Sequence, residues 1–182
     1  MKTPTKRITA DDLRKLPKAK VNELFAHLGP AKVDELQHDW KFWGRDAQFP
    51  PPDNDWNTWL INAGRGFGKT RCGAEWVRQQ VKLGHKRIAC VASTNSDIER
   101  VMVKGESGFL SVCWKHDKDN KGKHMGFPEW SPTKRSLTWA NGAKVEFYSA
   151  EEPERLRGPQ FSAAWCDELA AWNKDIDTWQ ML

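Results

Sequence analysis

The sequence predicts an α/β domain in which a mostly parallel sheet is flanked by helices, preceded by a small N-terminal helical arm. Apolar runs of strand length alternate with helix-like patterns, an order typical of parallel strands joined by helical crossovers. The clearest run, Arg87–Ala92, is nearly all apolar and is therefore expected to be a strand buried on both faces. A chain of 182 residues is long enough for one such domain with a real core.

Helices are predicted in the N-terminal arm. Apolar residues recur at helical spacing over residues 9–28, and Pro17 is expected to divide this stretch into two short helices. Gly29 and Pro30 should end the second of them, and a further helix is predicted at 31–43.

A proline-rich loop at residues 49–55 separates the arm from the rest of the chain. We therefore predict an arm at 1–43 and a main domain at 44–182. In order, the main domain is expected to contain a strand at 59–62, a helix at 70–83, a strand at 87–92, a short helix capped by Ser96 or Asp97 and running through 103, a surface loop at 116–135, hairpin strands at 136–139 and 144–148, a strand at 161–166 and a helix at 170–182.

The composition leaves several classes of partner open. Lys and Arg number 29 against 24 Asp and Glu, so the net charge is +5. This mild excess is compatible with nucleic acid or nucleotide, and equally with solubility alone. The N-terminus has charge but no apolar stretch, and no apolar run approaches the ~20 residues that cross a bilayer. We expect a soluble, intracellular protein without a membrane partner.

The four cysteines do not have the spacing of a metal site. Cys113 and His116 have no second pair beside them, which argues against zinc. Cys72, Cys90 and Cys166 fall in predicted helices or strands, where a free thiol behaves as a small hydrophobic group.

A glycine-rich segment lies where the strand at 59–62 should meet the helix at 70–83. A phosphate-binding P-loop (Walker A) needs glycines whose backbone N–H groups surround a phosphate, a Lys for the β- and γ-phosphates of ATP and a Ser or Thr for Mg²⁺. The segment meets these needs except at its first position, where Ala63 replaces Gly; the alternative is an ordinary strand-to-helix turn. The predicted nucleotide-binding residues here are Gly64, Arg65, Gly66, Phe67, Gly68, Lys69 and Thr70.

An acidic pair comes directly after the last predicted strand. The run at 161–166 delivers Asp167 to the carboxyl end of the sheet, where ligands of α/β proteins bind. We expect Asp167, with Thr70, to hold Mg²⁺ and Glu168 to activate the attacking water, the arrangement of a Walker B motif. The alternative is an acidic helix start that only complements the helix dipole.

Charge on a transferring phosphoryl group must also be offset, and arginine is suited to this. Arg65 inside the loop is the first candidate and Arg157 the second, although a salt bridge is nearly as good an explanation for Arg157. Gln48 is a candidate for contacting the adenine edge, with a plain surface glutamine as the alternative.

Four segments together resemble the ATPase region of tailed-phage and gene-transfer-agent terminase large subunits. The similarity begins near Trp40 and runs to the end of the sequence, while the first ~40 residues are not recognised. The matching segments are 56–78 with the glycine-rich loop, 101–108, 149–160 and 165–172.

This resemblance implies an ATP- and Mg²⁺-dependent motor that translocates double-stranded viral DNA into the capsid. It implies a homo-oligomeric ring that works with the portal protein and the small terminase subunit in the host cytoplasm. It also implies that Lys69 and Thr70 contact phosphate and Mg²⁺, that Asp167 holds Mg²⁺, and that Glu168 activates water. Arg65 and, less surely, Arg157 would approach the γ-phosphate.

Proteins of that family continue into a coupling motif and a nuclease, whereas this sequence stops at Leu182. We therefore expect an incomplete sheet, because in such ATPases a later strand lies between the strands at 59–62 and 161–166. This expectation opens an alternative function, a truncated or split terminase piece that binds nucleotide and a protein partner without turnover. A P-loop helicase of another family is the third possibility, against which segments 56–59 and 149–160 argue.

Overall fold

The computed structural model describes residues 8–52, 55–173 and 175–182. The chain forms two compact units, Met1–Ile61 and Asn62–Leu182. Each is described by itself. The functional division after residue 43 stays a prediction.

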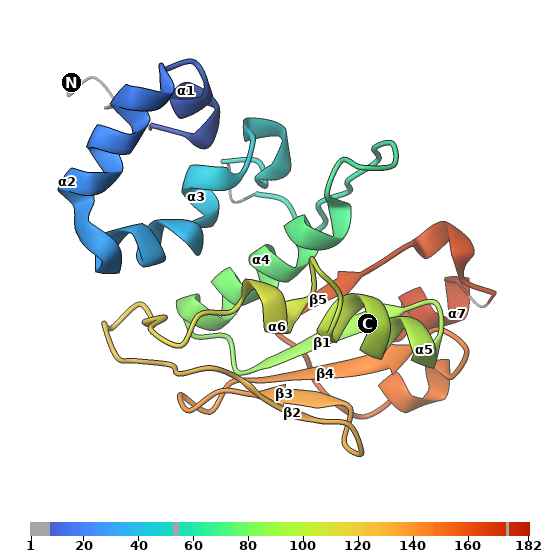
Figure 1. Cartoon of the computed structure of the whole chain (residues 1–182). Coiled ribbons are helices and arrows are strands. Elements are labelled where there is room, and N and C mark those ends of the chain that lie inside the picture. The colour runs from blue at the N-terminus through green and yellow to red at the C-terminus, as the bar shows by residue number, and fades with distance from the viewer. Residues whose placement is uncertain (1–7, 53–54, 174) are drawn as a thin grey trace. The chain divides into compact units, whose positions relative to one another are not determined.

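Helices and a 3-10 turn make up most of the described part of the first unit up to Gln48 (Figure 1). Helix α1 (Ala10–Arg14) begins with a capping box between Thr9 and Asp12. Helix α2 (Lys18–Gln37) starts after Pro17 and kinks at Gly29, whose φ of 72° is left-handed, so both expected breaks are confirmed. The helix predicted to reach residue 43 instead ends at Gln37.

A separate helix begins in the first unit because Asp39 caps it. Its carboxylate accepts the backbone N–H of Lys41 at the start of α3 (Trp40–Trp43). A 3-10 turn, η1 (Asp46–Gln48), comes next. Gln48 is buried, so its interpretation as a surface glutamine is wrong.

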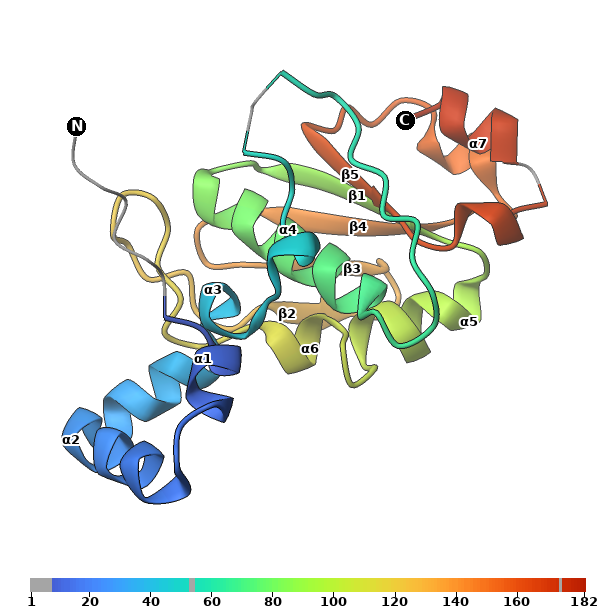
Figure 2. The same cartoon turned by 90° about the horizontal axis from the view of Figure 1, so that it is seen from above.

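The second unit contains a five-stranded mixed sheet in the order β2-β3-β4-β1-β5. Strand β1 (Arg87–Ala92) pairs in parallel with β4 (Lys144–Ser149) and β5 (Ala163–Cys166). Figure 2 shows these three strands side by side. Strand β3 (Ser136–Thr138) forms the predicted antiparallel hairpin with β4, and β2 (Glu129–Ser131) pairs antiparallel with β3. Half of the strand pairs are therefore parallel, fewer than expected.

The strand predicted at residues 59–62 does not form. Strands need a paired neighbour and a buried face. Within the described chain this segment has no ladder partner, Leu60 is 77% exposed, and Trp59 and Ile61 are only half-buried. In the described sheet β5 lies at the end of the strand order. Because only one of the two strands that should flank the predicted gap forms, the incomplete sheet stays a prediction.

Both faces of β1 are buried, as its apolar run predicts. Ile88, Cys90 and Ala92 join the larger core cluster with helices α4 (Lys69–Leu83) and α6 (Phe109–Val112). Ala89 and Val91 point to the other face, into a smaller cluster that includes Trp172. The alternation results from the two-residue period of a strand.

Helix α4 (Lys69–Leu83) packs directly on the edge strand β5. It ends at Gly84, which adopts the left-handed conformation that the sequence predicts for this stop. The approach is closest at Gly73, where an added Cβ atom would overlap the indole ring of Trp165. A glycine in the helix interior is therefore required by packing.

Two helix predictions need correction. The helix after β1 is capped by Thr94, whose hydroxyl accepts the N–H of Asp97, and not by Ser96 or Asp97. It consists of α5 (Asn95–Asp97) and a π-helical segment, η2 (Ile98–Val103). The helix predicted at 170–182 is broken because the indole N–H of buried Trp172 donates to the carbonyl of Asp167 and folds the chain back.

That last region is therefore two short elements, a 3-10 turn η4 (Leu169–Ala171) and helix α7 (Asp175–Gln180). Another 3-10 turn, η3 (Pro153–Leu156), lies after β4, and α7 and η3 are in contact. No helix in the described ranges is long and apolar enough to cross a membrane.

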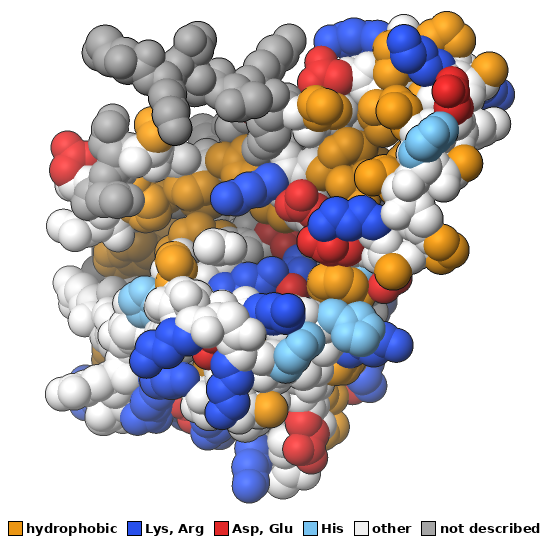
Figure 3. Space-filling view, turned by 90° about the vertical axis from the view of Figure 1, so that its left-hand side faces the viewer, with side chains coloured by type: hydrophobic (Ala, Val, Ile, Leu, Met, Phe, Trp, Pro, Cys, Tyr) orange, Lys and Arg blue, Asp and Glu red, His pale blue; other side chains and the backbone are white. Residues whose placement is uncertain are grey.

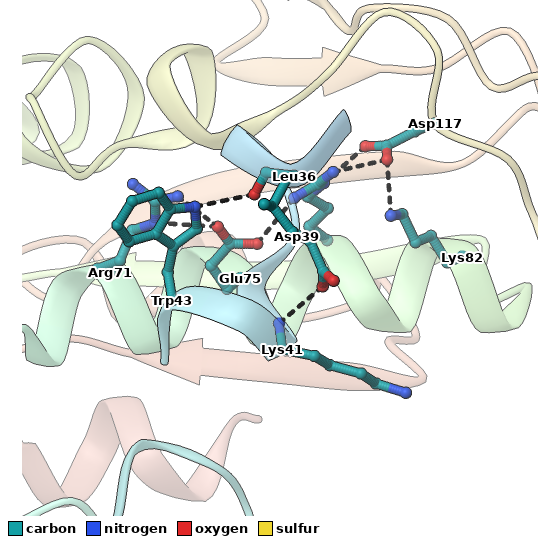
Figure 4. A network of polar contacts seen from close by, with 9 residues as sticks. Leu36, Asp39, Lys41, Trp43, Arg71, Glu75, Lys82 and Asp117 are labelled. Atoms are coloured by element: carbon teal, nitrogen blue, oxygen red, sulfur yellow. Dashed lines mark hydrogen bonds and ion pairs between the residues drawn. The ribbon is translucent and has the colours of Figure 1, made fainter. Parts of the chain in front are cut away.

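The segment at 116–135 is more ordered than the predicted surface loop. It includes β2, and it buries Asp117 and Met125. The guanidinium of Arg78 on α4 donates hydrogen bonds to both carboxylate oxygens of Asp117, each at 2.6 Å. The ammonium group of Lys82 forms an ion pair with the same carboxylate at 2.6 Å (Figure 4). A buried carboxylate needs such partners, which is why this loop is attached to the helix.

The contact between α4 and β5 gives a test of the fold. Gly73→Ala should lower the free energy of unfolding by about 1–3 kcal/mol, because its methyl group can be accommodated only by shifting the helix or Trp165. Gly64→Ala is the control, since no atom lies within 4 Å of its added Cβ. Equal urea midpoints for the two variants would contradict the close packing.

Candidate functional site

A cleft of about 530 Å³ opens at the carboxyl end of β5 and at the N-terminus of α4. All of its lining residues belong to the second unit. The lining residues are Arg65, Gly66, Gly68, Lys69, Thr70, Arg100, Val101, Gly105, Glu106, Ser107, Asp167 and Glu168.

The first wall is the glycine-rich turn. Gly66 and Gly68 have φ angles of 81° and 89°, which residues with a side chain rarely adopt. Gly68 is also the N-cap of α4, so the turn opens directly into the helix. Backbone N–H groups at a helix N-terminus lack intrahelical partners and, with the helix dipole, favour an anion.

Lys69 supplies a positive charge at the base of this turn. Its ammonium group donates to the carbonyls of Ala63 at 2.9 Å and Gly64 at 3.3 Å, folding the side chain back along the turn. Thr70 is the next residue on the first turn of α4 and also lines the cleft. Lys69, which carries the ammonium group, and Thr70, which carries the hydroxyl group, therefore both line the cleft.

The opposite side of the cleft is acidic. The backbone N–H of Asp167 donates to the carbonyl of Val91, which extends the β1–β5 ladder by one residue, and Glu168 then turns away in a left-handed conformation with φ of 50°. Burial, together with the neighbouring charge of Glu168, raises the pKa of Asp167 from 3.8 to about 6, although Lys69 opposes the shift. The cleft therefore holds two neighbouring carboxyl groups, one of which resists ionisation.

A third side of the cleft was not foreseen. Arg100 and Val101 come from η2, and Gly105, Glu106 and Ser107 from the turn after it. An added Cβ at Gly105 would crowd the carbonyl oxygens of residues 100 and 101, so the turn folds back tightly on the segment before it. The Gly-Glu-Ser-Gly sequence at 105–108 was the available indication, whereas nothing in the sequence distinguished Arg100.

The remaining predicted residues divide into two groups. Arg65 is exposed and lines the cleft. Arg157 does not: its guanidinium pairs with Glu154 at 3.0 Å, and both side chains are about two-thirds exposed. Gln48 belongs to the first unit, where its side chain accepts the backbone N–H of Arg45. The roles of all three residues stay predictions.

The side chains at the cleft suit a metal ion that takes only one or two of its ligands from the protein. No group of three or more His, Cys, Asp or Glu side chains is arranged to hold a metal within the described ranges. Thr70 and Asp167, however, both border the same small space next to Ser93 and Asp97. Mg²⁺ is usually held in this way, by one or two protein ligands with phosphates and water.

These features define a mixed α/β protein with a glycine-rich turn facing a carboxylate pair. The family described as "Terminase large subunit, T4likevirus-type, N-terminal" matches residues 60–182, more than half of the chain. The chain belongs to this family of phage DNA-packaging proteins, which confirms the resemblance found in the sequence. No curated protein matches the chain. No solved structure matches it.

The carboxylate pair gives a pH prediction. In Glu168→Gln the pKa of Asp167 should fall below about 6 but stay above 3.8, because the like charge is lost while burial remains. Since the folded pKa is raised, the contribution of Asp167 to the free energy of unfolding should fall as pH rises from about 4 to 6. Carboxyl NMR titration measures the pKa, with Glu154→Gln as the control. A pKa of Asp167 that is the same in Glu168→Gln as in the wild type would contradict the coupling.

Proposed function

We propose that this chain is the ATPase domain of a terminase large subunit and that its cleft binds and hydrolyses ATP to drive double-stranded DNA into the capsid. The observation that carries the proposal is one cleft lined by the glycine-rich turn, Lys69 and Thr70 and also by Asp167 and Glu168. Membership of the terminase family supports the same activity, since this family contains ATPases.

The turn would hold the phosphates of ATP. The space beside Gly64 and Gly66 is open, so an oxygen atom can approach the backbone there without meeting a side chain. Lys69 would exchange its two carbonyl acceptors for phosphate oxygens, which carry full negative charge and bind an ammonium group more strongly. Arg65 at the cleft wall would add charge near the γ-phosphate.

The acidic side would organise the metal and the water. Thr70 and Asp167 fit Mg²⁺ as hydroxyl and carboxylate ligands, and a bound Mg²⁺ offsets charge on the β- and γ-phosphates. Glu168 would orient the attacking water and accept its proton. Arg157 and Gln48 remain candidates for a catalytic arginine and an adenine contact, respectively, each outside the cleft's lining residues.

The partners and the cellular site depend on the proposed function. Double-stranded DNA, the portal protein and the small terminase subunit would be the partners, in a homo-oligomeric ring within the host cytoplasm. Membership of a family of phage DNA-packaging proteins supports this set.

Lys69→Ala tests the nucleotide site. It should remove measurable ATP–Mg²⁺ binding in titration calorimetry, because Lys69 places its ammonium group against the turn at the base of α4. Lys134→Ala changes the same charge at an exposed position between β2 and β3 and should bind as the wild type does. Equal affinity in the wild type and Lys69→Ala would refute the assignment of the phosphate site.

Glu168→Gln tests the chemical step. The variant should keep ATP affinity while phosphate release falls by about 10²–10⁴-fold, the usual contribution of a positioned general base. Glu154→Gln, at an exposed ion pair, is the control. An active Glu168→Gln enzyme would assign the base to another carboxylate, with Glu151 and Glu152 next to be tested.

A second candidate function is nucleotide binding without turnover, in partnership with another protein segment. It is favoured by the segment at 59–62, which enters the glycine-rich turn without strand pairing, and by the place of β5 at the end of the sheet. A turn that is not held by a strand on its N-terminal side positions phosphate less firmly. Steady-state turnover by the isolated chain decides between the two: rapid hydrolysis supports the motor domain, and binding alone supports the second candidate.

A further inference from the structure

A basic hairpin lies at the C-terminal end of α4, away from the cleft. Residues 115–124 form a loop closed by a bridge between Lys118 and His124. Its lysine and histidine side chains are exposed. Figure 3 shows Lys, Arg and His side chains gathered on the lower part of the face that it draws. We define the basic hairpin by the exposed residues Lys115, His116, Lys118, Lys121, Lys123 and His124.

The basic hairpin is built into the domain. Its base is the buried Asp117, held by Arg78 and Lys82 of α4. Burial alone would raise the pKa of Asp117, but the hydrogen bonds and charges of these two partners hold it below 3.8. Asn120 completes the attachment, because its backbone and side-chain N–H groups donate to the last carbonyls of α4, those of Lys82 and Leu83.

The lysines of the hairpin interact only weakly with acidic groups. The pKa of Asp119 is lowered chiefly by its hydrogen bond from the backbone N–H of Lys123, with smaller contributions from the charges of Lys121 and Lys123. The other carboxylate of the hairpin, Asp119, accepts the backbone N–H groups of Lys121 and Lys123 at 3.0 and 2.9 Å, which fixes the turn. Some lysines outside the hairpin pair with acids, as Lys104 does with Glu99, whereas others, such as Lys18 and Lys20, are also exposed. Over the residues that the structure describes, the four hairpin lysines make no ion pair. Their charge is therefore displayed on a backbone that is fixed to α4.

A phosphate backbone is the partner that this surface fits. Exposed lysines act as point charges for phosphates. The hairpin backbone is held by contacts of Asp117, Asp119 and Asn120, which reduces the backbone entropy lost on binding. Proteins that bind single strands add aromatic side chains on which bases stack. Residues 115–124 contain no Phe, Trp or Tyr, and the adjacent Trp114 is half-buried and engaged with the ring of His116, although Phe127 beyond the hairpin is 48% exposed. The chemistry favours contact with the outside of a duplex, independent of its sequence.

We propose that the basic hairpin is a surface by which this domain contacts the backbone of double-stranded DNA. The inference rests on the proposed function in that DNA is the cargo, but it assigns a place on this chain. The hairpin and the cleft are joined by α4, whose 15 residues span about 22 Å at 1.5 Å per residue. DNA at the hairpin and nucleotide in the cleft can therefore be tested separately.

The test is fluorescence anisotropy of a labelled, mixed-sequence DNA duplex with the full chain. Lys121→Gln/Lys123→Gln should weaken binding about 50-fold near 0.1 M salt, since each phosphate contact adds about 0.9 to the slope of log K against log salt. The slope itself should decrease by roughly two. Lys115→Gln/Lys118→Gln should act in the same way, which guards against a local effect of one pair.

Lys18→Gln/Lys20→Gln is the matched control, because it removes two exposed charges from α2 in the first unit. An equal loss of affinity in this control would show that only net charge matters and would overturn the proposal. So would unchanged affinity in both hairpin variants, or no DNA binding at all. Equal competition by polyglutamate at matched charge would assign the surface to an acidic protein instead.

Calorimetry with ATP separates this proposal from the function of the cleft. The hairpin variants should bind ATP as the wild type does, and Lys69→Ala should keep its affinity for the duplex. Loss of ATP binding in the hairpin variants would mean that the substitutions disturb α4, and would count against two separate sites. Failure of ATP binding in the wild type, with DNA binding intact, would refute the nucleotide assignment alone.

Discussion

The close packing of α4 against β5 fixes the arrangement of the second unit. Because Gly73 has no side chain, the helix lies directly on Trp165 and its axis is set relative to the edge of the sheet. The N-terminus of α4 then opens at the same cleft that receives Asp167 from the end of β5. A bulkier residue at position 73 would move the glycine-rich turn and the acidic pair relative to each other, so one contact controls both halves of the candidate site.

The cleft brings like charges together, and this is consistent with a binding role. Asp167 and Glu168 repel each other, and burial raises the pKa of Asp167 further. The ammonium group of Lys69 is meanwhile engaged with backbone carbonyls and not with a carboxylate. A carboxyl group with a raised pKa, such as Asp167, is typical of functional sites, where burial and neighbouring charges are arranged to shift pKa values.

Toward the C-terminal end of α4, in contrast, buried charges of opposite sign lie next to each other. Arg78 and Asp117 are both buried and satisfy each other, with Glu75 accepting a further hydrogen bond from Arg78. Removing one partner of such a pair typically costs more than the pair contributes, so it acts chiefly as a constraint on where the loop attaches. The outcome is a loop that buries Asp117 against α4 while its lysines face solvent.

Local patterns in the sequence determined the strand at 87–92, helix α4, the hairpin around Asn141 and the terminase family. The spacing of apolar residues, the glycines at turns and helix ends, and the residues of each motif can all be recognised within short segments. The sequence also brought Lys69, Thr70 and Asp167 to one expected site, and the structure places them at one cleft. Only the tertiary structure decided the rest. Residues 59–62 form no strand because pairing depends on a neighbour, Arg100 joins the cleft through a π-helical segment, and Asp117 is buried because a distant arginine receives it. Such long-range pairings leave no local pattern, since the partners are brought together only when the sheet and α4 are assembled.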